Sequence, residues 1–165
     1  MLGKEILFVL FTGEYDFSID QKGRLAIPAE IRTSMHPDHD GKAFYLTLGP
    51  NRTLCLYPEK IFDRLVDQIE EGLVPEESVQ EFGQLVFPLA TRLEWDTAGR
   101  VKISDRMRVR AGLKDRKVTL IGVRDHLEIR DRERWQAELE DRLAKQEDIF
   151  KRFARRRRNG AEGER

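Results

Sequence analysis

Residues 20–28 read DQKGRLAIP, and most of that pattern returns 76 positions later, where residues 96–104 read DTAGRVKIS. Asp, Gly, Arg and Ile recur in the same register. A polar turn with Gly near its tip, flanked by alternating apolar residues, indicates two short strands joined by a tight turn. Glycine adopts the positive φ that such a turn needs, and an Asp just before it can accept hydrogen bonds from the turn's own amides.

The repetition extends beyond the two turns. Each turn is followed by a short helical stretch, at residues 29–35 and 105–109, and then by two apolar stretches and an amphipathic helix. In that later part the offset between the copies falls to 73, so that Gly49 matches Gly122 and Leu56 matches Ile129. Two copies are too few for an open solenoid, so we expect two halves that close around one core.

These patterns predict a β-rich α+β fold with helical attachments. Apolar residues at helical spacing, together with Gly72 and Pro88 as end signals, predict an acidic helical linker between the copies. A later stripe that includes Trp135, Leu139 and Leu143 predicts one C-terminal amphipathic helix that runs into basic residues. The expected segments are a first module at residues 14–61, the linker at 62–89, a second module at 90–133, the C-terminal helix at 134–157 and a disordered tail at 158–165.

The charges of this chain of 165 residues sum to zero but are segregated. Charged residues make up 36% and hydrophobic residues 39%, which is typical of a globular protein with a highly charged surface. Residues 59–81 hold eight acidic and two basic side chains, and residues 100–117 hold eight basic and two acidic ones. The basic segment could attract a polyanion or an acidic partner, or it could pair with the acidic segment.

Basic side chains lie on or beside both turns. An Arg guanidinium can form two parallel hydrogen bonds to a phosphate or to the edge of a guanine base. The same arginines could instead pair with the aspartate that opens each turn, and spacing alone does not separate the two interpretations. The basic segment after the second turn favours nucleic acid. The candidate residues are Asp20, Lys22 and Arg24 in the first turn and Asp96, Arg100 and Lys102 in the second.

Other chemistries find little support in the sequence. Cys55 is the only cysteine, so we expect neither an internal disulfide nor a cysteine-based metal site, and its apolar strand favours a buried side chain. The loop at residues 36–41 holds two His and two Asp, but their spacing matches no strong metal motif. No phosphate-binding glycine loop or nucleophile elbow is present, so we expect no enzyme, cofactor or metal. The apolar run at residues 6–11 is too short to span a membrane.

Several stretches resemble the bacterial MraZ family. They are FTGEY at residues 11–15, DQKGRLAIP at 20–28, LYP at 56–58, DTAGR at 96–100, AGL at 111–113, Gly122 and LEI at 127–129. The resemblance covers roughly residues 11–143, and the doubled Asp-x-x-x-Arg motif is its most specific part. Because members of that family begin near the position of Phe11, we expect residues 1–10 to be an extension or the result of a misplaced start.

This resemblance implies both a fold and a function. It implies two fused swapped-hairpin modules of the AbrB type, which form a pseudo-dimeric barrel within one chain with helices outside. It also implies a DNA-binding transcriptional regulator of the division and cell-wall gene cluster, which acts on its own promoter and assembles into ring-like homo-oligomers. The Asp-x-x-x-Arg motifs fall on Asp20 with Arg24 and on Asp96 with Arg100.

We therefore expect a sequence-specific repressor that binds repeated boxes in double-stranded promoter DNA, in the cytoplasm and associated with the nucleoid. Arg24 and Arg100 are expected to contact a groove or phosphates, and Lys22 and Lys102 to contact phosphates alone. A small-molecule substrate and a membrane are not expected. The alternative is a protein-interaction ring or an antitoxin-like subunit for which DNA binding would be incidental.

Overall fold

The computed structural model describes residues 9–69 and 77–162, with side chains described as far as Arg156. The chain divides after Asp131 into two compact units, and each is considered by itself. Residues 70–76 of the predicted linker and residues 1–8 of the predicted extension lie outside the described residues.

The first unit contains both copies of the repeat. Each copy shows the predicted order of strand, turn, strand, short helix, strand and strand. The elements of the first copy are β1 (Glu14–Ser18), β2 (Arg24–Ala26), α1 (Ala29–Ser34), β3 (Phe44–Leu48), η1 (Pro50–Arg52) and β4 (Leu54–Pro58). The helices α2 (Glu59–Asp67), α3 (Glu77–Val86) and η2 (Phe87–Leu89) follow, and the second copy contains β5 (Thr91–Leu93), β6 (Arg100–Lys102), α4 (Asp105–Arg110), β7 (Lys117–Val123) and β8 (His126–Asp131).

The larger sheet has the strand order β1-β7-β8-β4-β3-β5, and its pairings are antiparallel. The two copies exchange strands in it. Strand β1 of the first copy pairs with β7 of the second, and β5 of the second copy pairs with β3 of the first. The copies meet at the middle of the sheet, where β4 pairs with β8. The α+β prediction is confirmed, and the sheet is built jointly by the two copies.

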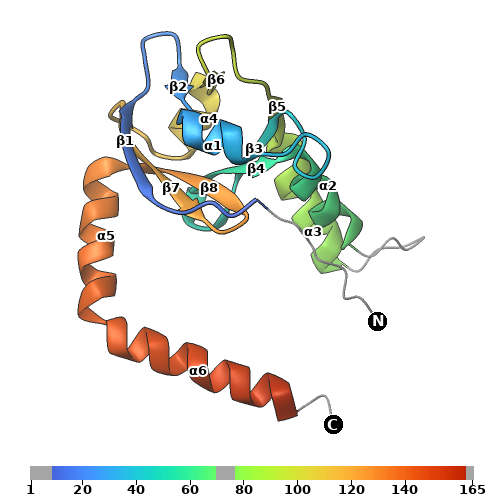
Figure 1. Cartoon of the computed structure of the whole chain (residues 1–165), viewed down its shortest axis with the longest axis vertical. Coiled ribbons are helices and arrows are strands. Elements are labelled where there is room, and N and C mark those ends of the chain that lie inside the picture. The colour runs from blue at the N-terminus through green and yellow to red at the C-terminus, as the bar shows by residue number, and fades with distance from the viewer. Residues whose placement is uncertain (1–8, 70–76, 163–165) are drawn as a thin grey trace. The chain divides into compact units, whose positions relative to one another are not determined.

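Strands β2 and β6 form a second, two-stranded ribbon. Its antiparallel register pairs Arg24 with Lys102 and Leu25 with Val101. Side chains alternate between the faces of a strand, so Leu25 and Val101 share one face and the two cations share the other. Leu25 and Val101 are fully buried, which places the cations on the outer face. Figure 1 shows the turns that precede β2 and β6 projecting in the same direction, at the top of the view.

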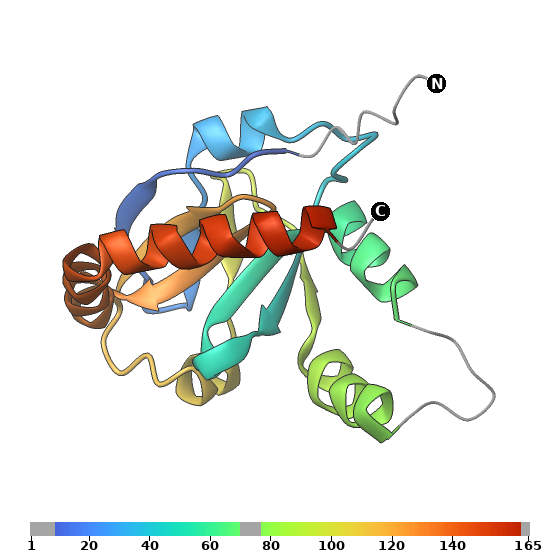
Figure 2. The ribbon, with the colours of Figure 1, turned by 90° about the horizontal axis from the view of Figure 1, so that it is seen from below.

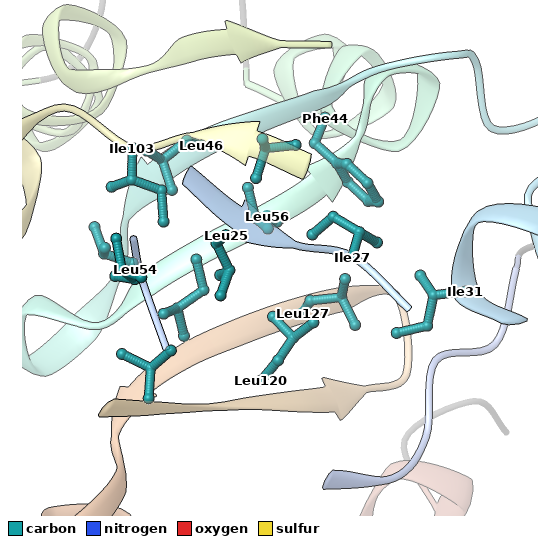
Figure 3. Close-up of a cluster of buried hydrophobic side chains, with 14 of the residues drawn as sticks. Leu25, Ile27, Ile31, Phe44, Leu46, Leu54, Leu56, Ile103, Leu120 and Leu127 are labelled. Atoms are coloured by element: carbon teal, nitrogen blue, oxygen red, sulfur yellow. The ribbon is translucent and has the colours of Figure 1, made fainter. Parts of the chain in front are cut away.

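The hydrophobic core lies where the ribbon and the sheet meet. Apolar side chains from the ribbon, the short helices and the central strands form one cluster. In Figure 3, Leu25 and Ile103 from the ribbon region lie among Leu54, Leu120 and Leu127 from the sheet. Burying one such side chain contributes about 1.5–3 kcal/mol relative to leaving it exposed. The cluster draws on both copies, so the predicted single core shared by two halves is present.

The two short helices begin in different ways at matching positions of the repeat. Pro28 occupies the N-cap of α1, and Ser104 occupies the N-cap of α4. The Ser104 hydroxyl accepts a hydrogen bond from the amide of Met107 at 3.3 Å, which satisfies a donor that the first helical turn leaves unpaired. Each helix buries one side chain in the core, Ile31 in α1 and Met107 in α4.

Helices α2 and α3 lie at the same end of the sheet (Figure 2). Side chains from both helices line an apolar cleft of about 450 Å³. Several of these side chains are substantially exposed, with Phe82 at 51% and Leu85 at 60% of their full accessible surface. The predicted acidic linker therefore contains two helices with apolar sides that face a common cleft.

The second unit consists of α5 (Arg132–Ala144) and α6 (Gln146–Glu162). The sequence predicts one continuous helix here, but the structure divides it at Lys145. The Lys145 amide donates to the carbonyl of Arg142, three residues back, and this tighter spacing is common where an α-helix ends. Helix α6 ends at Glu162, within the segment that the sequence analysis expected to be a tail. None of the described helices combines the length and apolar composition needed to cross a membrane.

Candidate nucleic-acid interface

The first turn, between β1 and β2, is closed by the carboxylate of Asp20. Asp20 Oδ1 accepts hydrogen bonds from the amides of Lys22 and Arg24, each at 2.9 Å. Asp20 Oδ2 accepts a hydrogen bond from Arg24 Nε at 2.6 Å. Gly23 has a φ of 78°, and a Cβ there would lie 2.6 Å from the carbonyl oxygen of Ile103. Both the conformation and the lack of space therefore require glycine at this position.

The second turn, between β5 and β6, repeats these contacts. Asp96 Oδ1 accepts hydrogen bonds from the amides of Ala98 and Arg100 at 2.9 and 3.0 Å. Asp96 Oδ2 accepts a hydrogen bond from Arg100 Nε at 3.0 Å and lies 2.8 Å from Arg100 Nη2. Both predicted Asp–Arg pairs are thus present. They leave part of each guanidinium available, because Arg has five donors and the Arg24 and Arg100 side chains remain 32% and 33% exposed.

These contacts hold both carboxylates in the ionised form. The amide of Arg24, followed by its guanidinium and the amide of Lys22, keeps the pKa of Asp20 below its usual value of 3.8. The guanidinium and then the amide of Arg100 do the same for the pKa of Asp96. Each arginine therefore binds its aspartate through both the main chain and the side chain, which fixes the start of β2 and of β6.

Each turn is also held by the other copy of the repeat. The amide of Ile103 donates to the carbonyl of Gly23 at 2.8 Å, and the amide of Ile27 donates to the carbonyl of Gly99 at 2.9 Å. These hydrogen bonds extend the ribbon at both of its ends. The two turns are consequently fixed relative to one another, which suits a surface that must match a rigid partner.

Two further arginines support the turns, and the sequence did not assign this role to them. Arg116, at the edge of β7, donates a hydrogen bond from its guanidinium to the carbonyl of Asp20. The Arg32 guanidinium lies against Gly99, where an added Cβ would come within 2.5 Å of it. Arg32 has a sequence signal, because it recurs as Arg108 in the second copy. Arg116 has no such sequence signal, because its contact with Asp20 forms only through the exchange of strands between the copies.

The outer face of the ribbon gathers cations from both copies. Arg24 and Lys102 are directly opposite one another, and Arg100 is opposite Ala26 on the same face. The Lys22 and Lys102 side chains are exposed. Asp20 and Asp96 compensate the charges of Arg24 and Arg100, so Lys22 and Lys102 give these six residues their net positive charge. All six residues predicted from sequence lie on this ribbon or its turns.

The turns should keep their hydrogen bonds down to about pH 4 and lose them in more acidic solution. A carboxyl whose pKa is lowered by folding contributes stability that is complete above its unfolded-state pKa and is lost as the pH falls through the folded-state value. The pKa values of Asp20 and Asp96 are lowered from 3.8, so the amide resonances of Lys22 and Ala98 should shift only below that pH in NMR spectra.

An Asp20→Asn variant distinguishes the titration of the first turn from that of the second. The acid shift of the Lys22 amide should disappear, because Asn does not titrate, while that of Ala98 should persist. A shift of the Lys22 amide that begins above pH 4 in the unmodified chain would contradict the prediction.

The fold and this surface define a class of protein. It is a β-rich protein in which two copies of a repeat exchange strands and together present a cationic ribbon with two Asp–Arg turns. Two segments, residues 10–79 and 86–159, match the family model described as MraZ protein, antitoxin-like. The chain belongs to the MraZ family of transcriptional regulators, which is not a family of enzymes. The two matched segments correspond to the two copies of the repeat.

Curated relatives support this assignment across most of the chain. The transcriptional regulator MraZ of Thermomicrobium roseum is 34% identical over 145 residues, which is 88% of this chain and 98% of the relative. That of Neisseria meningitidis is 36% identical over 131 residues, or 79% of this chain and 85% of the relative. That of Finegoldia magna is 30% identical over 140 residues, or 85% and 94%.

Proposed function

We propose that this chain is a sequence-specific DNA-binding protein that represses the division and cell-wall gene cluster from its own promoter, in the cytoplasm at the nucleoid. The observation that supports this most is the outer face of the ribbon, where Arg24 and Lys102 from different copies lie opposite one another. The relatives are named transcriptional regulators, which also supports a role in transcription.

The four cations have different roles in this proposal. Arg24 and Arg100 each retain donors beyond those that bind aspartate, and these donors contact phosphates or base edges in a groove. Lys22 and Lys102 contact phosphates only, and so position the ribbon without reading sequence. Asp20 and Asp96 do not touch DNA directly but orient the arginines, because each carboxylate fixes one edge of a guanidinium.

A single ribbon offers a small contact surface, so we propose that several chains act together. A ring of identical chains would present the ribbon repeatedly, and binding of one box would raise the effective concentration of the next ribbon near the next box. Spacing of the boxes would then contribute to specificity. We also propose that the sheet and the ribbon close into a barrel, since one apolar cluster joins them.

A second candidate function is the binding of a protein partner, as for an antitoxin. The apolar cleft between α2 and α3 favours it, because Phe82, Leu85 and Phe87 remain exposed beside it. Exposed apolar surface of this kind often marks a contact with another protein. In this case DNA binding would be incidental.

Salt dependence separates the two functions. The experiment is a titration of the purified chain against DNA from upstream of its own gene, with scrambled DNA as competitor, at about 50 and about 200 mM salt. Four phosphate contacts give a log–log slope of about −3.6, which weakens binding roughly 150-fold between these concentrations. Tight binding with this slope that resists the competitor is expected. Equal affinity for scrambled DNA would contradict the proposal.

A further inference from the structure

A polar cluster lies on the outer face of the larger sheet, and the proposed function does not use it. Strands β4 and β8 pair at this point, and their buried Leu residues alternate with Cys55 on β4 and with His126 and Glu128 on β8. Each of these three side chains offers one potential metal-ligating atom, and the three atoms lie within 4.8 Å of one another. Cysteine, histidine and carboxylate together are a ligand set that favours zinc.

The strand exchange creates this cluster. Cys55 and Glu128 occupy equivalent positions in the two copies, 73 residues apart. Because the copies meet where β4 pairs with β8, the register places Cys55 directly opposite Glu128. His126 lies two residues before Glu128 on the same face of its strand. The sequence analysis predicted no cysteine-based metal site because the chain has a single cysteine. It could not take into account His126 and Glu128, which lie near Cys55 only because β4 pairs with β8.

We propose that Cys55 Sγ, His126 Nε2 and Glu128 Oε1 bind a zinc ion, with water as the fourth ligand. Zinc bonds of about 2.0–2.3 Å in a tetrahedral site place neighbouring ligand atoms roughly 3.3–3.6 Å apart. His126 Nε2 and Glu128 Oε1 are 3.6 Å apart in the structure. The remaining separation closes through rotation of the Cys55 and Glu128 side chains. The site goes beyond the proposed regulatory function and does not depend on it.

The surrounding groups already hold the ligands in suitable orientations. His126 Nδ1 lies 2.8 Å from Asp125 Oδ1, which leaves Nε2 facing the cluster. Histidine ligands of zinc usually donate their other ring nitrogen to such a carboxylate. Glu128 Oε2 accepts a hydrogen bond from Arg130 at 2.9 Å, which leaves Oε1 available. The Tyr57 ring stacks on that of His126, with 4.7 Å between centroids, and restricts its rotation.

The cluster is partly shielded from water. Cys55 is 3% exposed, while the His126 and Glu128 side chains are 15% and 21% exposed, so solvent reaches the site past these two residues. Zinc binding releases the thiol proton of Cys55 to solvent.

The first test is metal binding by the full chain without an affinity tag. Zinc is added after treatment with a chelator, unbound metal is removed by gel filtration, and bound metal is measured by mass spectrometry. One zinc per chain is expected. At a free zinc concentration about a hundredfold above the dissociation constant, Tm should rise by roughly 5–10 °C, and EDTA should reverse the rise.

Cobalt identifies the ligands. A thiolate bound to Co²⁺ gives a charge-transfer band in the near ultraviolet, and Cys55 is the only thiol in the chain. The band should be present in the unmodified chain and in a His36→Gln/His39→Gln control, which removes the histidines of the loop at residues 36–41. It should be absent in Cys55→Ser. His126→Gln and Glu128→Gln should each bind zinc at least 100-fold more weakly, and Asp125→Asn about 10–100-fold more weakly.

Each result bears on the proposal directly. Absence of the band in the unmodified chain, or zinc bound equally well by the His126→Gln and Glu128→Gln variants, would overturn it. Loss of zinc only in the His36/His39 control would place the metal in the loop instead. Circular dichroism and a thermal melt without metal accompany each variant, and if Cys55→Ser fails to fold, the affinities of the other two ligand variants decide the question.

Discussion

Replacement of both Arg24 and Arg100 by Ala will abolish binding to the operator while the chain keeps its fold and its oligomeric state. Each arginine that contacts a base edge or phosphate contributes about 1–3 kcal/mol to binding. The double variant should therefore bind at least about 30-fold more weakly per site, and more weakly still if several ribbons bind together. Gel-shift titration measures the affinity, and gel filtration with circular dichroism measures assembly and fold.

A matched control removes the same charge from another part of the chain. Arg142 and Lys145 form i,i+4 ion pairs with Glu138 and Asp141, much as Arg24 and Arg100 pair with residues four positions away. The double variant Arg142→Ala/Lys145→Ala should keep the operator affinity within about threefold. The double variant Arg24→Lys/Arg100→Lys should lose part of that affinity, because lysine cannot form the two parallel hydrogen bonds of a guanidinium. An Arg24/Arg100 double variant that unfolds or dissociates would mean that the arginines mainly stabilise the turns.

Leu25→Ala will destabilise the entire first unit, not only the ribbon. Leu25 and its cross-strand partner Val101 are fully buried, and Leu25 belongs to the cluster that joins ribbon and sheet. Removing a buried leucine side chain costs about 2–5 kcal/mol, depending on how far the cavity collapses. Urea denaturation at a fixed chain concentration measures the loss, and both copies should unfold in one transition because they share the core.

Leu10→Ala provides the same chemical change at a position that is 67% exposed. Its effect on the free energy of unfolding should stay within about 0.5 kcal/mol. If Leu25→Ala costs less than about 1 kcal/mol, or if the two copies unfold in separate transitions, the ribbon does not share a core with the sheet.

The sequence predicted the parts of this structure that depend on short-range chemistry. Asp20 and Gly23 define a turn within four residues, and the recurrence of that pattern at Asp96 and Gly99 was sufficient to find the second one. Both Asp–Arg pairs were anticipated as one of two interpretations. Alternation of apolar residues indicated strands beside the turns, because a half-buried strand has a period of two, and short apolar stretches indicated the later strands of each copy.

Features that depend on the register between distant strands could not be predicted from the sequence. The opposition of Arg24 to Lys102 follows from the pairing of β2 with β6, and that of Cys55 to Glu128 from the pairing of β4 with β8. Nothing local in either strand specifies its partner or its register. The division of the C-terminal helix at Lys145 also escaped detection, because its apolar stripe continues on both sides of the break.

The exchange of strands between the copies has a consequence for synthesis of the chain. Strand β1 pairs with β7, and the Asp16–Thr119 hydrogen bond between them joins residues 103 positions apart. At roughly 5–20 residues per second, β1 leaves the ribosome about 5–20 s before its partner strand does. Contacts of such high contact order also slow folding itself. The first copy is therefore a nascent segment with unpaired strand edges, and protection by a chaperone until the second copy is complete would increase the yield of folded chain.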